Sequence, residues 1–176
     1  YTKITENHQV DEGQAKEIAK VVGLAAVKYG DLSNQASKDY IFDMERFTSF
    51  EGNTGPYLLY TIVRIKSILN KYNEMNVEKK DYPILPAHSK SEKDLMALLA
   101  LLNANMETAS VETAPHKICA YIYELANAFN RFYHETKILV QEDEAIQGSY
   151  IKLLTLTKRV MELCIDVLGF DAPDKM

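Results

Sequence analysis

One polar stripe in the sequence has the residue types that contact unpaired nucleotides. Four residues recur at a 4-3-4 spacing, which places them on one side of a helix: Tyr60, Arg64, Ser67 and Lys71. A base stacks on an aromatic ring of this kind, and each such stack contributes roughly 1–3 kcal/mol. The two cations suit phosphate oxygens. The stripe therefore predicts contact with single-stranded nucleic acid, although a merely solvated helix face carries the same cations.

A second candidate group lies in the apolar periodic segment that begins at Pro115. Tyr133 falls at the edge of the buried stripe of this segment, where a ring is half packed and half offered to a partner. Asn130 lies on the more polar side beside it, and its amide suits the edge of a splayed-out base. Outward tyrosines on helices are more often partly buried fillers than base platforms, so both interpretations stay open at this point.

The stretch "EGNTG", from Glu51 to Gly55, predicts a bent surface loop directly before the Tyr60 helix. Glycine reaches positive φ at little cost and lets another group approach closely, so Gly52 and Gly55 are expected to serve backbone geometry. Pro56 follows where the first turn of a helix tolerates proline.

Hydrophobic periodicity predicts a mainly helical chain. The expected helices cover residues 11–29, 56–72, 91–102, 106–112, a long segment from Pro115, and 145–168. Ser91 is expected to cap the third of them, with Asp94 as its partner. The segment "DYIFD", residues 39–43, is short enough for a strand, and residues 73–90 are expected to form a connector. The predicted fold class is an all-α helical bundle over residues 56–176, preceded over residues 1–55 by a small, mostly helical remnant of another domain.

Composition excludes several functional classes for this chain. The 176 residues carry a net charge of −5, which argues against binding nucleic acid through bulk charge but permits a local basic face. No run of about 18 apolar residues predicts a membrane span. The four histidines lack the spacings of helical metal sites, and no phosphate loop or nucleophile elbow occurs. Cys119 and Cys164 are expected to be buried, inert thiols in a cytoplasmic protein.

Four stretches resemble arginyl-tRNA synthetase, a class I aminoacyl-tRNA synthetase. They are "VVGLAAVKYGDLSNQASKDYIFD" (residues 21–43), "SFEGNTGPYLLYTIVRIKSIL" (49–69), "APHKICAYIYELANAFNRFYHETKIL" (114–139) and the final "LGFDAPDKM" (168–176). Neither the His-x-Gly-His nor the Lys-Met-Ser-Lys type of ATP signature of that family occurs. The resemblance therefore implies a carboxyl-terminal fragment of such an enzyme, with the end of the catalytic domain up to residue 55 and an all-helical anticodon-binding domain from residue 56.

The resemblance also implies roles for individual residues. The loop that matches the segment approaching the anticodon comprises Ser49, Phe50, Glu51, Gly52, Asn53 and Thr54. Tyr60 and Tyr133 match family tyrosines at the anticodon, and Met176 matches a terminal methionine near the same bases. Arg64 and Lys71 are expected to contact phosphates, and Asn130 a base edge. Lys137 stands where some relatives carry an aromatic residue.

Three functions compete on these observations. The favoured one is recognition of the anticodon loop of an arginine tRNA, by a fragment that binds no cofactor and is inactive alone. The parent enzyme, a ligase using ATP and magnesium, would supply the catalytic and amino-terminal domains, which are missing here, and no membrane is involved. The alternative is a helical protein-interaction module without RNA binding, supported by the acidic net charge. The third function, an autonomous small-molecule enzyme, is not supported by any set of catalytic residues in the sequence.

Overall fold

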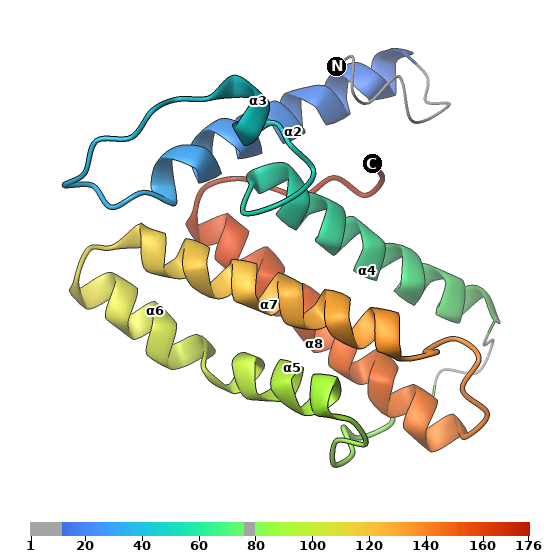
Figure 1. The fold of residues 1–176 in the computed structure, drawn as a ribbon. Helices are drawn as coiled ribbons and strands as arrows, with labels where there is room; N and C mark the ends of the chain where they lie inside the picture. The colour runs from blue at the N-terminus through green and yellow to red at the C-terminus, as the bar shows by residue number, and fades with distance from the viewer. Residues whose placement is uncertain (1–11, 76–79) are drawn as a thin grey trace.

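The computed structural model describes residues 12–75 and 80–176, and in these residues the chain is all-α (Figure 1). They form seven helices and no strand, which confirms the predicted fold class. The helices are α2 (Glu12–Leu32), α3 (Met44–Phe47), α4 (Gly55–Met75), α5 (Lys90–Ala100), α6 (Leu102–Val111), α7 (Pro115–Glu135) and α8 (Glu144–Val167). No helix among the described residues has the length and apolar character needed to cross a membrane.

Helix α7 is the central element of the bundle. It packs against α5 and α6 on one side and against α4 and α8 on the other, as Figure 1 shows. Helix α2 lies across the amino-terminal part of α4 and also touches α7. After α8 the chain turns back, and its last residues run above α4, between α4 and α2 (Figure 1). The end of the chain is thereby brought next to the helix that carries Tyr60.

The buried side chains follow the helical spacing seen in the sequence. The predicted apolar stripe of α7 is buried throughout: Ile118, Ile122, Leu125, Phe129 and Phe132. In α4 the first three predicted core residues are fully buried, whereas Leu69 and Tyr72 are only partly covered. Cys119 and Cys164 are both buried and unbridged, as expected, and burial raises the pKa of each thiol to about 12.

Most predicted helix boundaries agree with the structure to within a few residues, and one cap was misplaced. The predicted start at Asp11 and part of the 73–90 connector lie outside the described residues. Helix α5 is capped by Ser89, not Ser91: the Ser89 side chain accepts a hydrogen bond from the Glu92 amide at 3.1 Å. The Glu92 carboxylate in turn accepts from the His88 amide at 2.7 Å. The partner of Ser89 is therefore Glu92, three residues later. Ser91 is also followed by an acidic residue, Asp94, at the same spacing, so the spacing alone did not distinguish the two serines.

The predicted strand at residues 39–43 is wrong. This segment is irregular, and it passes from α2 to the short helix α3 without a neighbouring strand among the described residues. Extended, β-prone residues form a strand only when a partner supplies backbone hydrogen bonds. Phe42 instead packs edge-on against the Phe47 ring, with the ring centroids 4.9 Å apart. The segment before residue 56 is therefore helical and irregular, without the mixed α/β character that a strand would have given it.

The predicted domain boundary at residue 56 stays a prediction. Helices α2 and α4, on either side of it, share one hydrophobic core. Ala15, Val22, Ala25 and Tyr29 of α2 belong to the same buried cluster as Leu58 and Ile62 of α4. Whatever its origin, the segment before residue 56 helps to fix the position of α4.

Thr113 adopts a left-handed backbone conformation where helix α6 ends. Its φ is 49°. Two amides close the helix end: that of Thr113 donates to the Ser110 carbonyl at 3.2 Å, and that of Ala114 donates to the Ala109 carbonyl at 2.9 Å. Glycine is the usual residue at this position of such a helix end, because a β-branched side chain is strained at positive φ.

Replacing Thr113 by glycine is expected to stabilise the protein. Relief of the backbone strain exceeds the entropy that glycine adds to the unfolded chain, so Thr113→Gly should raise the free energy of unfolding by about 0.5–1 kcal/mol in urea titration. Ser110→Gly, inside the exposed part of α6, is the matched control and should lower it by about 0.5–1 kcal/mol. A loss of stability in both variants would contradict the strain at Thr113.

Candidate nucleic-acid interface

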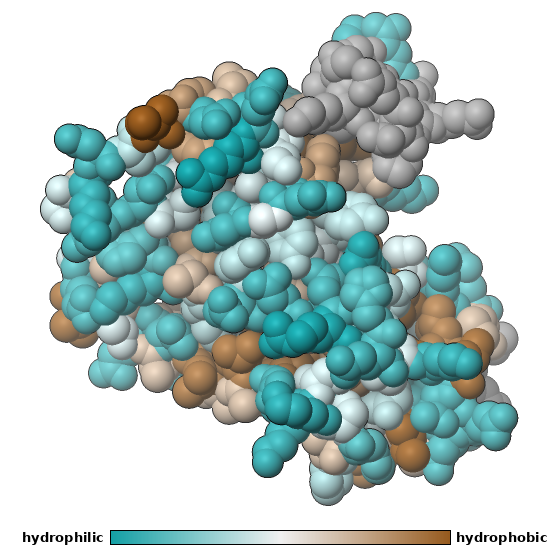
Figure 2. All heavy atoms as spheres, viewed as in Figure 1, coloured by the Kyte–Doolittle hydropathy of each residue, from teal (hydrophilic) through white to brown (hydrophobic). Residues whose placement is uncertain are grey.

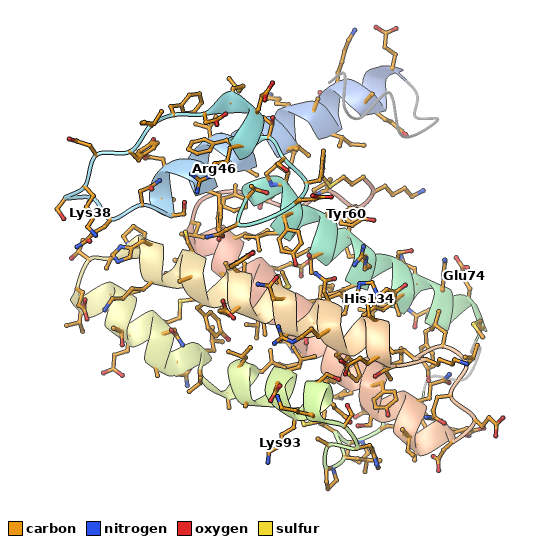
Figure 3. The ribbon with its side chains drawn as sticks, in the orientation of Figure 1. Lys38, Arg46, Tyr60, Glu74, Lys93 and His134 are labelled. Atoms are coloured by element: carbon orange, nitrogen blue, oxygen red, sulfur yellow. The ribbon has the colours of Figure 1, made fainter. Side chains whose placement is uncertain are left out.

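A groove of about 640 Å³ lies between α4 and the carboxyl-terminal end of α7. Five of the residues predicted from the sequence line it together: Tyr60, Arg64, Lys71, Tyr133 and Met176. Ser67 of the polar stripe lines it as well. Side chains that are far apart in the chain therefore meet on one concave surface. In Figure 3, Tyr60 on α4 and His134 on α7 mark its two helical walls.

The Arg64 guanidinium joins the two tyrosines. Its central carbon lies 4.7 Å from the centroid of the Tyr60 ring and 5.4 Å from that of the Tyr133 ring. Both distances are within the range of cation–π attraction. The Tyr133 ring also stacks with the Phe129 ring, with centroids 6.0 Å apart and ring planes 23° apart. Tyr60 is 40% exposed, so part of its ring remains available to a partner.

Asn130 holds the arginine in this place. Its side-chain oxygen accepts a hydrogen bond from Arg64 at 2.7 Å, and its amide nitrogen donates to the Tyr57 hydroxyl at 2.8 Å. The Tyr57 hydroxyl donates in turn to the Asn127 side chain at 2.8 Å. The predicted contact of Asn130 with a base edge stays a prediction; in the structure, both ends of its amide bind protein groups, which makes it a support for Arg64.

The groove is basic although the whole chain is acidic. Arg64, Lys71 and Lys137 line it, and no described residue that lines it is acidic. The ion pairs among the described residues include none of these three cations. Figure 2 shows that hydrophilic residues cover most of the face seen there. Local concentrations of one charge attract ligands of the opposite charge even when net charge opposes them.

The predicted loop, residues 49–54, does not line this groove. Asn53 and Thr54 line a second, smaller cavity of about 320 Å³ against α2 and α3. Glu51, Gly52 and Asn53 are exposed, while Ser49 and Phe50 are partly covered and Phe50 packs against the core. The loop precedes α4 directly, so it lies at the end of the helix that carries Tyr60. Its predicted contact with a ligand stays a prediction.

Local hydrogen bonds fix the shape of the loop. The Thr54 hydroxyl donates to the Ser49 carbonyl at 2.6 Å and accepts from the Tyr57 amide at 3.2 Å, so it both closes the loop and caps α4. Gly52 has φ 79°, which confirms the expected backbone role of this glycine. The hydroxyl of Tyr29, buried in α2, lies 2.6 Å from the Asn53 side-chain oxygen and 2.9 Å from the Cys119 carbonyl.

Gly55 permits the close contact between α4 and α2. A Cβ atom at this position would lie within 2.6 Å of the carbonyl carbon of Ala25 and closer still to its oxygen. Any side chain here would push the start of α4 away from α2, so the expected geometric role of Gly55 is confirmed.

The carboxyl-terminal wall of the groove was largely missed from the sequence. The segment Thr136 to Val140, directly after α7, lines the groove, and only Lys137 in it had been noticed. His134 also lines the groove, and its ring lies 5.7 Å from that of Tyr133. His134 lies on the polar side of the Pro115 helix, beside Asn130, as its helical spacing predicted. The residues after α7 follow no helical period, so their signal in the sequence was their position just after that helix. Among the described residues, no three potential metal ligands come together; stacking and ion pairing are the chemistry that the groove offers.

Comparison with protein families matches residues 58–176 to the DALR anticodon binding domain. Two of the similar proteins, both named arginine–tRNA ligase, illustrate the match. One, from Agathobacter rectalis, is 64% identical over 99% of this chain and 30% of its own length. The other, from Alkaliphilus oremlandii, is 51% identical over 100% of this chain and 30% of its own length. The chain thus spans about three tenths of these relatives, and the resemblance found in the sequence is confirmed.

Solved structures of arginyl-tRNA synthetases share the fold, and two of them serve as examples. The arginyl-tRNA synthetase of Thermus thermophilus superposes with a TM-score of 0.86 at 26% identity, covering 97% of this chain and 29% of that one. The arginyl-tRNA synthetase of Plasmodium falciparum gives a TM-score of 0.81 at 26% identity, covering 99% of this chain and 30% of that one.

The role of Asn130 in holding Arg64 is open to direct test. Asn130→Ala removes the charge-assisted hydrogen bond to the guanidinium and should lower the free energy of unfolding by about 1–3 kcal/mol. It should also increase the mobility of the Arg64 side chain, measured by NMR relaxation at its Nε. Asn127→Ala is the matched control, because Asn127 binds the same Tyr57 hydroxyl without touching Arg64. Equal mobility of Arg64 in both variants would show that Asn130 does not hold it.

Proposed function

The chain belongs to the DALR anticodon-binding domain family, and on that premise we propose that it is the anticodon-reading part of an arginine–tRNA ligase. The groove between α4 and α7 receives unpaired bases of the anticodon loop. The similarity to proteins named arginine–tRNA ligase supports the choice of arginine tRNA over other tRNAs.

The observation that carries this proposal is the arrangement of two tyrosine rings around one arginine in a basic groove. Proteins read single-stranded RNA by stacking splayed bases on aromatic and guanidinium planes and by bonding their exposed edges. Tyr60 and Tyr133 supply rings from two helices, Arg64 supplies a plane between them, and Met176 adds an apolar edge. Lys71 and Lys137 lie in the same groove, within the reach of a nucleic-acid backbone.

Cytosine is the base that this groove is proposed to select. Every arginine codon has G in the middle, so every arginine anticodon has C there, and this cytosine is the simplest shared determinant. Its ring stacks on the tyrosine faces, and its N3 and O2 acceptors suit a cationic pocket. Uracil presents an N–H at position 3 instead, and that donor faces the same cations without an acceptor to bind.

The exposed loop residues Glu51, Gly52 and Asn53 form a proposed second contact with the anticodon loop. Their backbone is held by the Thr54 cap and by Asn53 at Tyr29, so little ordering entropy is lost on binding. The loop leads directly into α4, the helix that carries the Tyr60 stripe, and Thr54 caps that helix.

The remaining functions of the ligase belong to the rest of the parent protein in this proposal. Those missing parts hold ATP and magnesium, attach arginine to the tRNA in the cytoplasm, and bind the tRNA outside the anticodon loop. The chain alone binds no cofactor and is inactive as a ligase, and its contribution is the correct choice of tRNA.

An anticodon stem-loop tests the proposed choice of cytosine. The chain should bind an arginine anticodon stem-loop, and changing the middle C to U should weaken binding roughly tenfold or more, measured by fluorescence anisotropy, because one bonded base edge contributes about 1–3 kcal/mol. Tyr60→Ala should weaken binding of the C form, and Tyr60→Phe, which keeps the ring, should weaken it less. Equal affinity for the C and U forms would refute the proposed recognition of cytosine. Absence of binding to either form would support the alternative function, a helical protein-interaction module.

The lysine in the stripe is expected to contact a phosphate. Lys71→Ala should weaken stem-loop binding for the C and U forms alike and reduce the slope of log K against log salt by about 0.7. Lys93→Ala on α5 is the matched control: this exposed lysine lies outside the groove, as Figure 3 shows, and should leave the slope unchanged. An unchanged slope in Lys71→Ala would place the RNA backbone elsewhere.

A further inference from the structure

The segment after α8 is fixed at its beginning by the end of that helix. The Phe170 amide donates to the Ile165 carbonyl at 3.1 Å and the Gly169 amide to the Asp166 carbonyl at 2.9 Å, the pattern of a Schellman helix end. Phe170 is buried in the core. The Lys28 ammonium on α2 also donates to the Gly169 carbonyl. The chain therefore leaves α8 in a set direction, toward α4.

A single lysine on α4 then binds the next residues of this segment. The Lys66 ammonium donates to the carbonyls of Ala172 and Pro173 at 3.4 and 3.2 Å and to the Asp174 carboxylate at 3.0 Å. An ammonium group has three donors, and these contacts use all of them. The Lys66 side chain is only 16% exposed. Its hydrogen bond and charge hold the pKa of the Asp174 carboxyl below its usual value.

Lys66 does not belong to the groove that holds the tyrosines. It follows Arg64 by two residues, which places it about 200° around the helix from that side chain. It lines a different groove, between α4 and α8, together with Asp174. Met176, two residues beyond Asp174, lines the tyrosine groove. The carboxyl-terminal segment thus passes across α4 from the face of Lys66 to the face of Tyr60.

We infer that Lys66 is a positioning residue for anticodon binding: by fixing residues 172–174 it holds Met176 as a wall of the tyrosine groove. The inference rests on the proposed function of that groove. Without the three bonds from Lys66, the last residues lose their polar anchor and retain the packing of Ala172 and Met176 against the core. RNA binding would then have to order them, and affinity falls by the entropy that this ordering costs.

An NMR measurement without RNA tests the holding of Met176 alone. In the chain with ¹³C-methyl methionine, Lys66→Met should make the Met176 methyl group mobile, while the methyl of Met161, buried in the core, should not change. Lys66→Arg retains the charge and the donors and should restore the Met176 signal. Lys158→Met is the matched control. Lys158 and Lys66 both form an ion pair with Glu162, but Lys158 donates to none of residues 172–174 in the structure. An unchanged Met176 methyl in Lys66→Met overturns the inference.

A double-mutant cycle on stem-loop affinity tests whether the fixed position of Met176 strengthens RNA binding. Lys66→Met and Met176→Ala should each weaken binding roughly threefold to tenfold, and the double variant should be no weaker than Met176→Ala alone. Fully additive losses would show that Lys66 binds the RNA itself, and would overturn the inference, as would unchanged affinity in Lys66→Met. If Lys66→Met does not fold, Asp174→Ala removes one of the three bonds and should give a smaller change in the same direction.

The two proposals fail in different ways. If the unsubstituted chain binds no stem-loop while Lys66→Met still frees Met176, the anticodon function fails and the lysine holds the segment for another reason, which overturns its role in RNA binding. If the unsubstituted chain binds and distinguishes C from U while Lys66→Met binds equally well, the anticodon function stands and the inference about Lys66 is overturned.

Discussion

The contact between one guanidinium and two tyrosine rings sets the geometry of the groove. Arg64 and Tyr60 belong to α4 and Tyr133 belongs to α7, so the contact exists only while these two helices keep their spacing and rotation. Asn130 and Tyr57 secure the same spacing by hydrogen bonds from both helices. The proposed recognition surface is therefore a product of helix packing, and it depends on the buried stripes of α4 and α7 as well as on the exposed side chains.

Charge and packing are divided between the faces of α4. One face carries buried leucine and isoleucine side chains, a second carries the tyrosine and cations of the groove, and a third carries Lys66. No acidic residue among the described ones lines the groove with these cations, although the chain has a net charge of −5. This separation explains how an acidic chain presents a surface suited to a polyanion, since the field near a surface follows its local charges.

The sequence predicted what depends on local spacing and failed where distant segments meet. The stripe of Tyr60, Arg64 and Lys71 followed from helical periodicity, and so did the edge position of Tyr133. The role of Lys66 had no such signal, because its partners lie more than 100 residues away. The false strand at residues 39–43 has the same cause: its residues favour extended backbone, and only the fold determines whether a partner strand is present. That five of the predicted residues share one groove came from the structure alone.

The several faces of α4 make this helix intolerant of changes in length. Inserting or deleting one residue between Pro56 and Tyr60 would turn everything after it by about 100° relative to the anchored beginning at Gly55. The tyrosine would then leave the groove, the lysine would lose the returning segment, and apolar side chains would meet water. Indels in this helix should therefore be far rarer among relatives than substitutions at its exposed positions.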